Sequence, residues 1–127
     1  AIAVSLCEAG VGQLTISNRN FAKAQQLVDL LVKDGGFNNV TVEPMSETDG
    51  AGVDMIINST SLGLHADDAT PLTLDQVAND TLIADIIMVP AETRWLQEAA
   101  QRGLAVHYGC HMLDYQIDLI GQFIGAF

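Results

Sequence analysis

The chain has 127 residues, of which 49% are hydrophobic. This length allows one domain with a buried core and excludes two domains of ordinary size, while the apolar content excludes a disordered polar chain. Asp and Glu number 16 against 5 for Lys and Arg, which gives a formal net charge of −11. So acidic a chain repels phosphate backbones and anionic lipids, and we therefore expect neither nucleic acid nor a membrane as its partner.

The chain carries no recognisable targeting or membrane-spanning segment. The apolar stretch at its start lacks a basic region and is interrupted at Glu8, which is not the pattern of a signal peptide. Cys7 and Cys110 lie far apart and form no CxxC pair. We therefore expect two reduced thiols and a cytoplasmic location.

Hydrophobic spacing predicts alternating helices and strands. Apolar residues recur at helical spacing before Gly35-Gly36, namely Phe21, Ala24, Leu27, Val28 and Leu31, whereas residues 82–89 form a continuous apolar run that stops at Pro90. The predicted elements are, in chain order, a helix over 1–9, a strand over 13–18, a helix from 21 to 34, a strand over 40–42, a loop over 46–52, a strand over 53–58, a loop over 60–71, a short helix over 72–77, a strand over 82–89, a helix over 92–102, a strand over 104–108 and a final helix over 113–127.

This alternation predicts an α/β fold. Continuously apolar strands are typical of a sheet whose two faces are both covered by helices, so we expect an open, mostly parallel sheet of this kind. Ligands of such sheets bind at the carboxyl ends of the strands. The residues to consider for function therefore directly follow the strands, at 18–20, 58–61, 88–90 and 109–111.

Arg19 is the first candidate. In parallel sheets that bind dinucleotides, an Arg at the tip of the second strand pairs with the 2′-phosphate of the adenosine ribose. Guanidinium suits this task because it forms two parallel hydrogen bonds with a phosphate. Lys23 lies one helical turn further on, in a chain with few cations. The alternative is an ordinary surface Arg, although a cation near a helix start is unfavourable for the helix dipole.

Residues 58–63 follow an apolar strand with small polar side chains, which suit a ribose or diphosphate edge. An ordinary Ser/Thr/Asn turn explains them equally well. The cluster of His107, Cys110, His111 and Asp114 matches no zinc-binding spacing, so we expect structural or surface roles and no metal site.

Four segments together resemble motifs of the shikimate and quinate dehydrogenase family. The family patterns are Asn-Arg-Thr-x-x-Lys/Arg-Ala, Asn-Ala-Thr-Ser-x-Gly-Met, Asp-x-x-Tyr-x-Pro-x-x-Thr and Gly-x-x-Met-Leu-x-x-Gln. The matching segments occur in the same order and are NRNFAKA (18–24), NSTSLGL (58–64), DIIMVPAET (85–93) and GCHMLDYQ (109–116).

The resemblance implies the C-terminal, Rossmann-like dinucleotide-binding domain of an NADP-dependent enzyme that reversibly reduces 3-dehydroshikimate to shikimate. NAD is the alternative cofactor, and the substrate would be a cyclic hydroxy acid. The cofactor would be bound by residues of all four segments, and Met88 and Gln116 would lie on the substrate side. The implied cofactor-binding residues are Asn18, Arg19, Asn20, Lys23, Asn58, Thr60, Ser61, Ile86, Gly109 and Met112.

The chain departs from the family pattern mildly at Asn20, which replaces Thr, and at Leu64, which replaces Met, and more strongly in two further respects. Met88 replaces the usual Tyr, and because Met donates no hydrogen bond, the substrate could be quinate or another hydroxy acid. The first strand, its Gly-rich turn and the N-terminal substrate domain with the catalytic Lys–Asp pair have no counterpart here. We therefore expect residues 1–127 to be a truncated cofactor-binding domain that is inactive alone.

Two hypotheses of different classes follow. The first is the cofactor-binding part of a shikimate dehydrogenase-like enzyme. The second is a noncatalytic nucleotide-binding or interaction module, in which exposed apolar surface favours a homo-oligomer.

Overall fold

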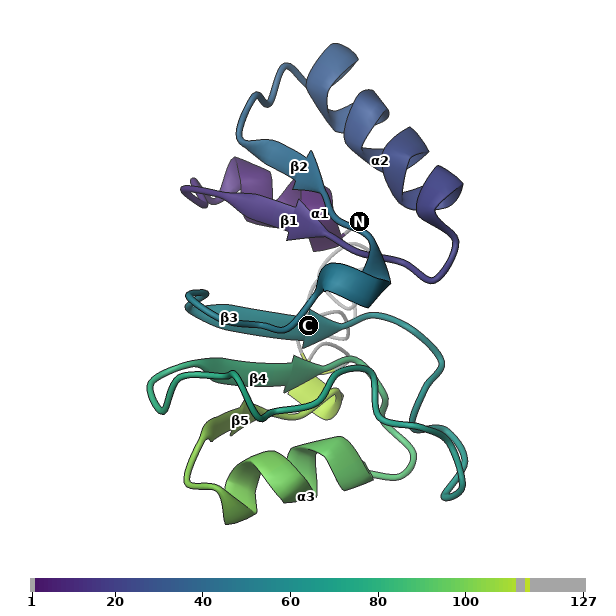
Figure 1. Cartoon of the computed structure of the whole chain (residues 1–127), viewed down its shortest axis with the longest axis vertical. Helices are drawn as coiled ribbons and strands as arrows, with labels where there is room; N and C mark the ends of the chain where they lie inside the picture. The colour runs from purple at the N-terminus through teal and green to yellow at the C-terminus, as the bar shows by residue number, and fades with distance from the viewer. Residues whose placement is uncertain (1, 112–113, 115–127) are drawn as a thin grey trace, which may run out of the picture. The chain divides into compact units, whose positions relative to one another are not determined.

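The computed structural model describes residues 2–111 and 114, which fold as two compact units (Figure 1). The first unit comprises the residues up to Thr48 and the second begins at Asp49. Every strand pairing within the described residues is parallel, which confirms the predicted α/β class. No helix among these residues has the length and apolar character needed to cross a bilayer.

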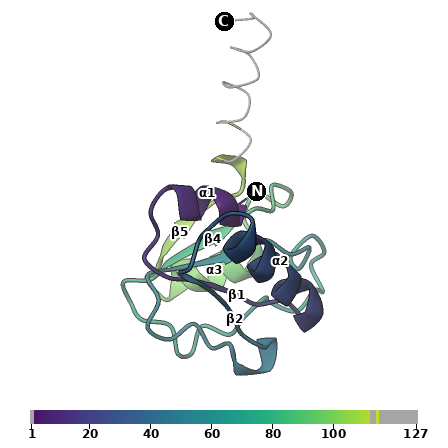
Figure 2. The same ribbon diagram turned by 90° about the horizontal axis from the view of Figure 1, so that it is seen from above.

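The first unit is built on one pair of strands. Its elements are α1 (Ile2–Glu8), β1 (Leu14–Ile16), α2 (Phe21–Lys33), β2 (Val40–Val42) and the 3-10 helix η1 (Met45–Glu47). Strand β1 pairs with β2 so that Leu14 faces Val40 and Ile16 faces Val42. The strand pair and α2 are seen from a second direction in Figure 2.

Helix α2 confirms the predicted helix, but Phe21 and Leu27 of the predicted apolar stripe are exposed. Ala24, Val28 and Leu31 are its buried residues, and their spacing of four and three places them on one face. Val28 and Leu31 form a cluster with Cys7 of α1 and Val40 of β2. The apolar stripe of α2 thus forms the core of the first unit with one residue each from α1 and β2.

The second unit is a three-stranded sheet with one helix against it. Its elements are β3 (Met55–Asn58), β4 (Leu82–Asp85), α3 (Arg94–Gln101) and β5 (Ala105–His107), and the strand order is β3-β4-β5. Helix α3 packs on β4 and β5. The core consists of residues from α3, from β4 and from the segments beside them, namely Leu74, Ile83, Trp95, Leu96, Ala99 and Leu104.

Three local predictions were wrong. Residues 72–77 form no helix, because the carbonyl of Leu72 accepts the indole N–H of Trp95 at 2.9 Å and is thereby taken by a distant side chain. The first residues of the predicted loop over 46–52 belong to η1, which extends to Glu47. Strand β4 ends at Asp85, four residues before the predicted end. Of the predicted final helix over 113–127, residue 114 is helical and the remaining positions lie outside the described residues.

Candidate functional site

The turn after β1 is held by two asparagine side chains. Asn18 Oδ1 accepts the backbone N–H of Asn20 at 2.9 Å, and Asn20 Oδ1 accepts the N–H of Lys23 at 3.3 Å as the N-cap of α2. Asn side chains suit both positions because they bond to backbone groups two or three residues ahead. The turn leaves Arg19 and Lys23 exposed beside the start of α2.

Arg19 and Lys23 differ from the arginines of the second unit in that their side chains have no partner among the described residues. Arg94 donates to the backbone carbonyl of Asp68 at 2.7 Å, and Arg102 forms ion pairs with Asp75 and Glu98 at 3.1 and 3.2 Å. Within the described part of the chain, the side chains of Arg19 and Lys23 have no hydrogen bond or ion pair. A shallow depression lined by residues 18–23 surrounds them. Their charges are therefore available to an anionic ligand.

Asn58 organises the loop that follows β3. Its side chain is only 3% exposed and uses both of its polar atoms inside the protein. Oδ1 accepts the backbone N–H and the hydroxyl of Thr60 at 3.0 and 2.6 Å, while Nδ2 donates to the carbonyl of Leu62 at 2.9 Å. The loop is thereby fixed in a shape that leaves Ser61 exposed.

Asp85 connects this loop to the segment after β4. Its carboxylate is 3% exposed and accepts from Asn58 Nδ2 at 3.2 Å, from the N–H of Ile87 at 3.0 Å and from the hydroxyl of Thr93 at 3.0 Å. The bond to Ile87 also explains the early end of β4, because a backbone donor that could extend the strand is taken by a side chain. Asp85 and Thr93 belong to the third motif, but nothing in the sequence pattern assigned them a role.

Two glycines bring the strand ends together. A Cβ on Gly109 would overlap the backbone carbonyl groups of Ile86 and Ile87, so only glycine allows this close approach. Gly63 has a φ of +116°, and a Cβ there would lie 3.0 Å from Ile87 Cδ1. The structure thus brings the predicted residues Ile86 and Gly109 into contact and places the loop after β3 against the segment after β4. Figure 1 shows this loop and segment leaving their strands on the same side.

Two apolar residues that come shortly after Ile86 in the sequence are exposed on the surface. Met88 is 43% exposed and Val89 is 79% exposed, just beyond the end of β4. The predicted residues Met112 and Gln116 lie outside the described residues. The predicted site residues therefore fall into two groups, one after β1 in the first unit and one after β3, β4 and β5 in the second.

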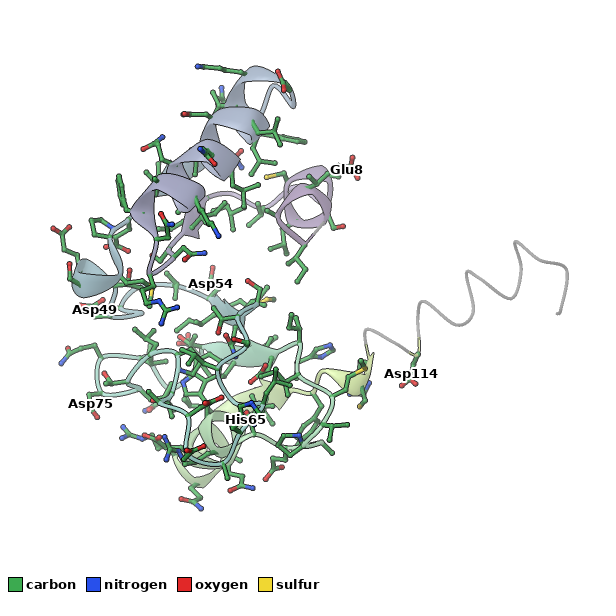
Figure 3. All side chains as sticks on the ribbon, turned by 90° about the vertical axis from the view of Figure 1, so that its right-hand side faces the viewer. Glu8, Asp49, Asp54, His65, Asp75 and Asp114 are labelled. Carbon is green, nitrogen blue, oxygen red and sulfur yellow. The ribbon has the colours of Figure 1, made fainter. Side chains whose placement is uncertain are left out.

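Asp68 was not anticipated as part of this region. Its Oδ2 accepts the backbone N–H groups of Gly63 at 3.0 Å and of His65 at 3.2 Å, and these bonds hold the pKa of Asp68 below its ordinary value of 3.8. The loop borders a cavity of about 350 Å³ whose other wall includes Arg94 and Trp95 at the start of α3. Figure 3 labels His65 on this loop. Gly63 and Asp68 are both residue types that are common in turns, and this composition is the signal in the sequence for such a loop.

Tyr108 lies at the end of β5 and connects it to the segment before α3. Its hydroxyl donates to Glu92 Oε2 at 2.8 Å. This hydrogen bond, together with desolvation and the negative charge of Glu92, raises the pKa of Tyr108 above 10.0.

Comparison with known proteins finds relatives among the shikimate dehydrogenases. The chain is 35% identical over 116 residues to the shikimate dehydrogenase (NADP(+)) of Geobacillus sp. (strain WCH70). The match covers 91% of this chain and 42% of the relative. The chain is homologous to a part of the shikimate dehydrogenases. It spans about two fifths of the length of the curated relatives that it matches. No family model matches the sequence.

Solved structures of similar sequence share the fold. Quinate dehydrogenase from Corynebacterium glutamicum, in complex with NAD, has a TM-score of 0.87 and 25% identity, covering 98% of this chain and 45% of that protein. The ligand-free 5-ketofructose reductase of Gluconobacter sp. strain CHM43 has a TM-score of 0.73 and 32% identity, covering 88% of this chain and 41% of that protein. The Rossmann-like fold implied by the shikimate dehydrogenase motifs is confirmed.

Proposed function

We propose that this chain is the NADP-binding part of a shikimate dehydrogenase-like oxidoreductase. The enzyme reversibly transfers hydride between NADP and a cyclic hydroxy acid, with 3-dehydroshikimate and shikimate as the leading substrate pair. The related Geobacillus protein carries the name shikimate dehydrogenase (NADP(+)). In this proposal the 127 residues bind the cofactor, and the chemical step needs residues from the rest of an enzyme of the relatives' length.

The observation that carries the proposal is the exposed pair of cations after β1. Arg19 and Lys23 flank the first turn of α2 without any side-chain partner among the described residues. A 2′-phosphate bound there would receive two guanidinium hydrogen bonds and a second positive charge from Lys23. Asn18 and Asn20 support this site by fixing the turn. The net charge of −11 makes this local positive site unusual in the chain.

The second group of residues is assigned to the remainder of the dinucleotide by the resemblance to the family motifs. In the proposal the exposed Ser61 and the Thr60 backbone lie along the cofactor, and Ile86 and Gly109 lie near the nicotinamide. The close contact of Gly109 with Ile86 gives that end a rigid backbone surface. Asn58 acts indirectly, because its buried side chain shapes the loop. Met112 and Gln116 keep their proposed roles beside the nicotinamide and at a substrate hydroxyl.

The identity of the substrate depends on Met88. This residue is 43% exposed where the family pattern has Tyr, and a thioether donates no hydrogen bond to a substrate oxygen. Quinate or another hydroxy acid is therefore the alternative substrate. The similarity to a quinate dehydrogenase and to a 5-ketofructose reductase supports this wider range.

Calorimetric titration of the chain with NADP+ and with NAD+ tests the cofactor assignment. Charge-assisted hydrogen bonds contribute about 1.5–3 kcal/mol, so Arg19→Ala should weaken NADP+ binding by about 10- to 100-fold and leave NAD+ binding nearly unchanged. Lys33→Ala removes another exposed cation of α2, at its opposite end, and serves as the matched control that should change neither affinity.

Two outcomes would contradict the proposal. Equal weakening of both cofactors by Arg19→Ala would mean that Arg19 does not recognise the 2′-phosphate. If the unaltered chain bound neither cofactor and formed a stable oligomer, the noncatalytic interaction module would be the better explanation.

A further inference from the structure

Three metal-binding side chains lie together just after β5. Cys110, His111 and Asp114 each offer one ligand atom, and these atoms all lie within 4.8 Å of one another. Cys110 and Asp114 are exposed and His111 is partly buried. Asp114 is labelled in Figure 3 beyond the end of the sheet. The cluster is therefore open to solvent and accessible to an ion.

Helical geometry explains why these residues meet. Residues 110, 111 and 114 are helical, and Asp114 lies four residues after Cys110 and three residues after His111 in the sequence. Residues at both spacings are neighbours on a helix surface. The ring of His107 lies against that of His111, with 4.7 Å between their centroids, and limits the orientations of the His111 imidazole. Helical conformation thus supplies the proximity that the sequence spacing alone did not reveal.

The mixed set of donors selects the kind of metal. Thiolate and imidazole favour Zn²⁺ and similar transition metals, whereas Mg²⁺ and Ca²⁺ prefer sites made of oxygen atoms. Donors around tetrahedral zinc lie about 2.0–2.3 Å from the ion and hence roughly 3.3–3.8 Å apart. A separation of 4.8 Å or less therefore needs only small side-chain rotations to close. The ionised thiolate and carboxylate would also balance the two charges of the ion.

We propose that Cys110, His111 and Asp114 form a Zn²⁺ site whose fourth position is occupied by water. None of the three donors is assigned to the cofactor or the substrate above, although all three belong to the segment 109–116 that also carries Gly109, Met112 and Gln116. The proposal departs from the expectation, drawn from the sequence, that these residues have structural or surface roles. Binding releases protons, because the sulfur and the imidazole nitrogen coordinate in their deprotonated forms.

Titration with Zn²⁺ against a chromophoric chelator, under reducing conditions, tests the site. We expect one ion per chain, and at least about tenfold weaker binding for Cys110→Ser and for His111→Ala. Co²⁺ provides a second readout, because coordination by a thiolate gives an intense near-ultraviolet charge-transfer band. That band should appear with the unaltered chain and disappear in Cys110→Ser.

The control is His65→Ala, which removes an exposed imidazole from the loop after β3 and should leave Zn²⁺ affinity within about twofold. Cys110→Ser nearly preserves the size of an exposed side chain, and circular dichroism checks that each variant is folded. Zn²⁺ affinity unchanged by Cys110→Ser, or the lack of a thiolate band with Co²⁺, would overturn the proposal.

Discussion

The hydroxyl of Thr93 donates to the carboxylate of Asp85 across 3.0 Å and accepts the backbone N–H of Leu96 at 3.3 Å. One buried threonine thus caps α3 and anchors the helix to the end of β4. Asp85 extends the same network to Asn58, the last residue of β3. The carboxyl ends of two strands and the start of a helix therefore depend on one carboxylate.

Removing that carboxylate should destabilise the second unit strongly. Asp85→Ala leaves the buried donors of Asn58, Ile87 and Thr93 without their acceptor, so we expect the free energy of unfolding to fall by about 2–4 kcal/mol. Urea denaturation followed by circular dichroism measures this change. Asp75→Ala is the control, because its exposed ion pair with Arg102 should contribute less than about 1 kcal/mol. Equal effects of the two substitutions would contradict a central role for Asp85.

A methyl group at Gly109 should separate the ends of β4 and β5. Gly109→Ala places a Cβ against the carbonyl groups of Ile86 and Ile87, so we expect a loss of about 1–3 kcal/mol in thermal or urea unfolding. Gly12→Ala is the matched control, because nothing lies within 4 Å of the position that its added methyl group would take. That substitution should be neutral or slightly stabilising. A stable Gly109→Ala variant would show that the close approach is not required.

Asp68 should make stability depend on acidic pH. Because the N–H groups of Gly63 and His65 lower its pKa in the folded protein, the ionised carboxylate favours the native state. This contribution is complete above the ordinary value of 3.8 and is lost as the pH falls through the lowered folded value.

Unfolding of Asp68→Asn and the unaltered chain at about pH 6 and about pH 3 checks this prediction. The difference between the two proteins should shrink at the lower pH. A difference independent of pH would contradict the assignment.

Glu92 should control the ionisation of Tyr108. The phenol donates its proton to Glu92 Oε2 at 2.8 Å, which raises the pKa of Tyr108 above its ordinary value of 10.0. The resulting stability is present below pH 10 and is lost as the pH rises through the folded pKa. Absorbance titration of the phenol in a Tyr115→Phe background should give a lower pKa after Glu92→Gln. Glu98→Gln should leave it unchanged, because Glu98 pairs with Arg102 instead.

Local sequence patterns predicted most of the regular elements. The apolar spacing of α2, the stop before Gly35 and the apolar core of β4 depend on residues within a few positions of one another. The same patterns failed at residues 72–77, where the apolar side chains suited a helix. There the indole of Trp95, 23 residues after Leu72, takes the Leu72 carbonyl. Long-range contacts of this kind outweigh local preference.

By itself, the sequence determined the alternation of elements, the parallel α/β class and the position of Arg19 and Lys23 after a strand. Only the tertiary structure decided how the strand ends are used. It showed that Asn58 is an internal organiser, that Asp85 accepts three hydrogen bonds and that Gly109 meets Ile86. The physical reason is that periodicity records which side of an element is apolar. Which buried donor meets which acceptor depends on strand register and on loops that bring distant residues together.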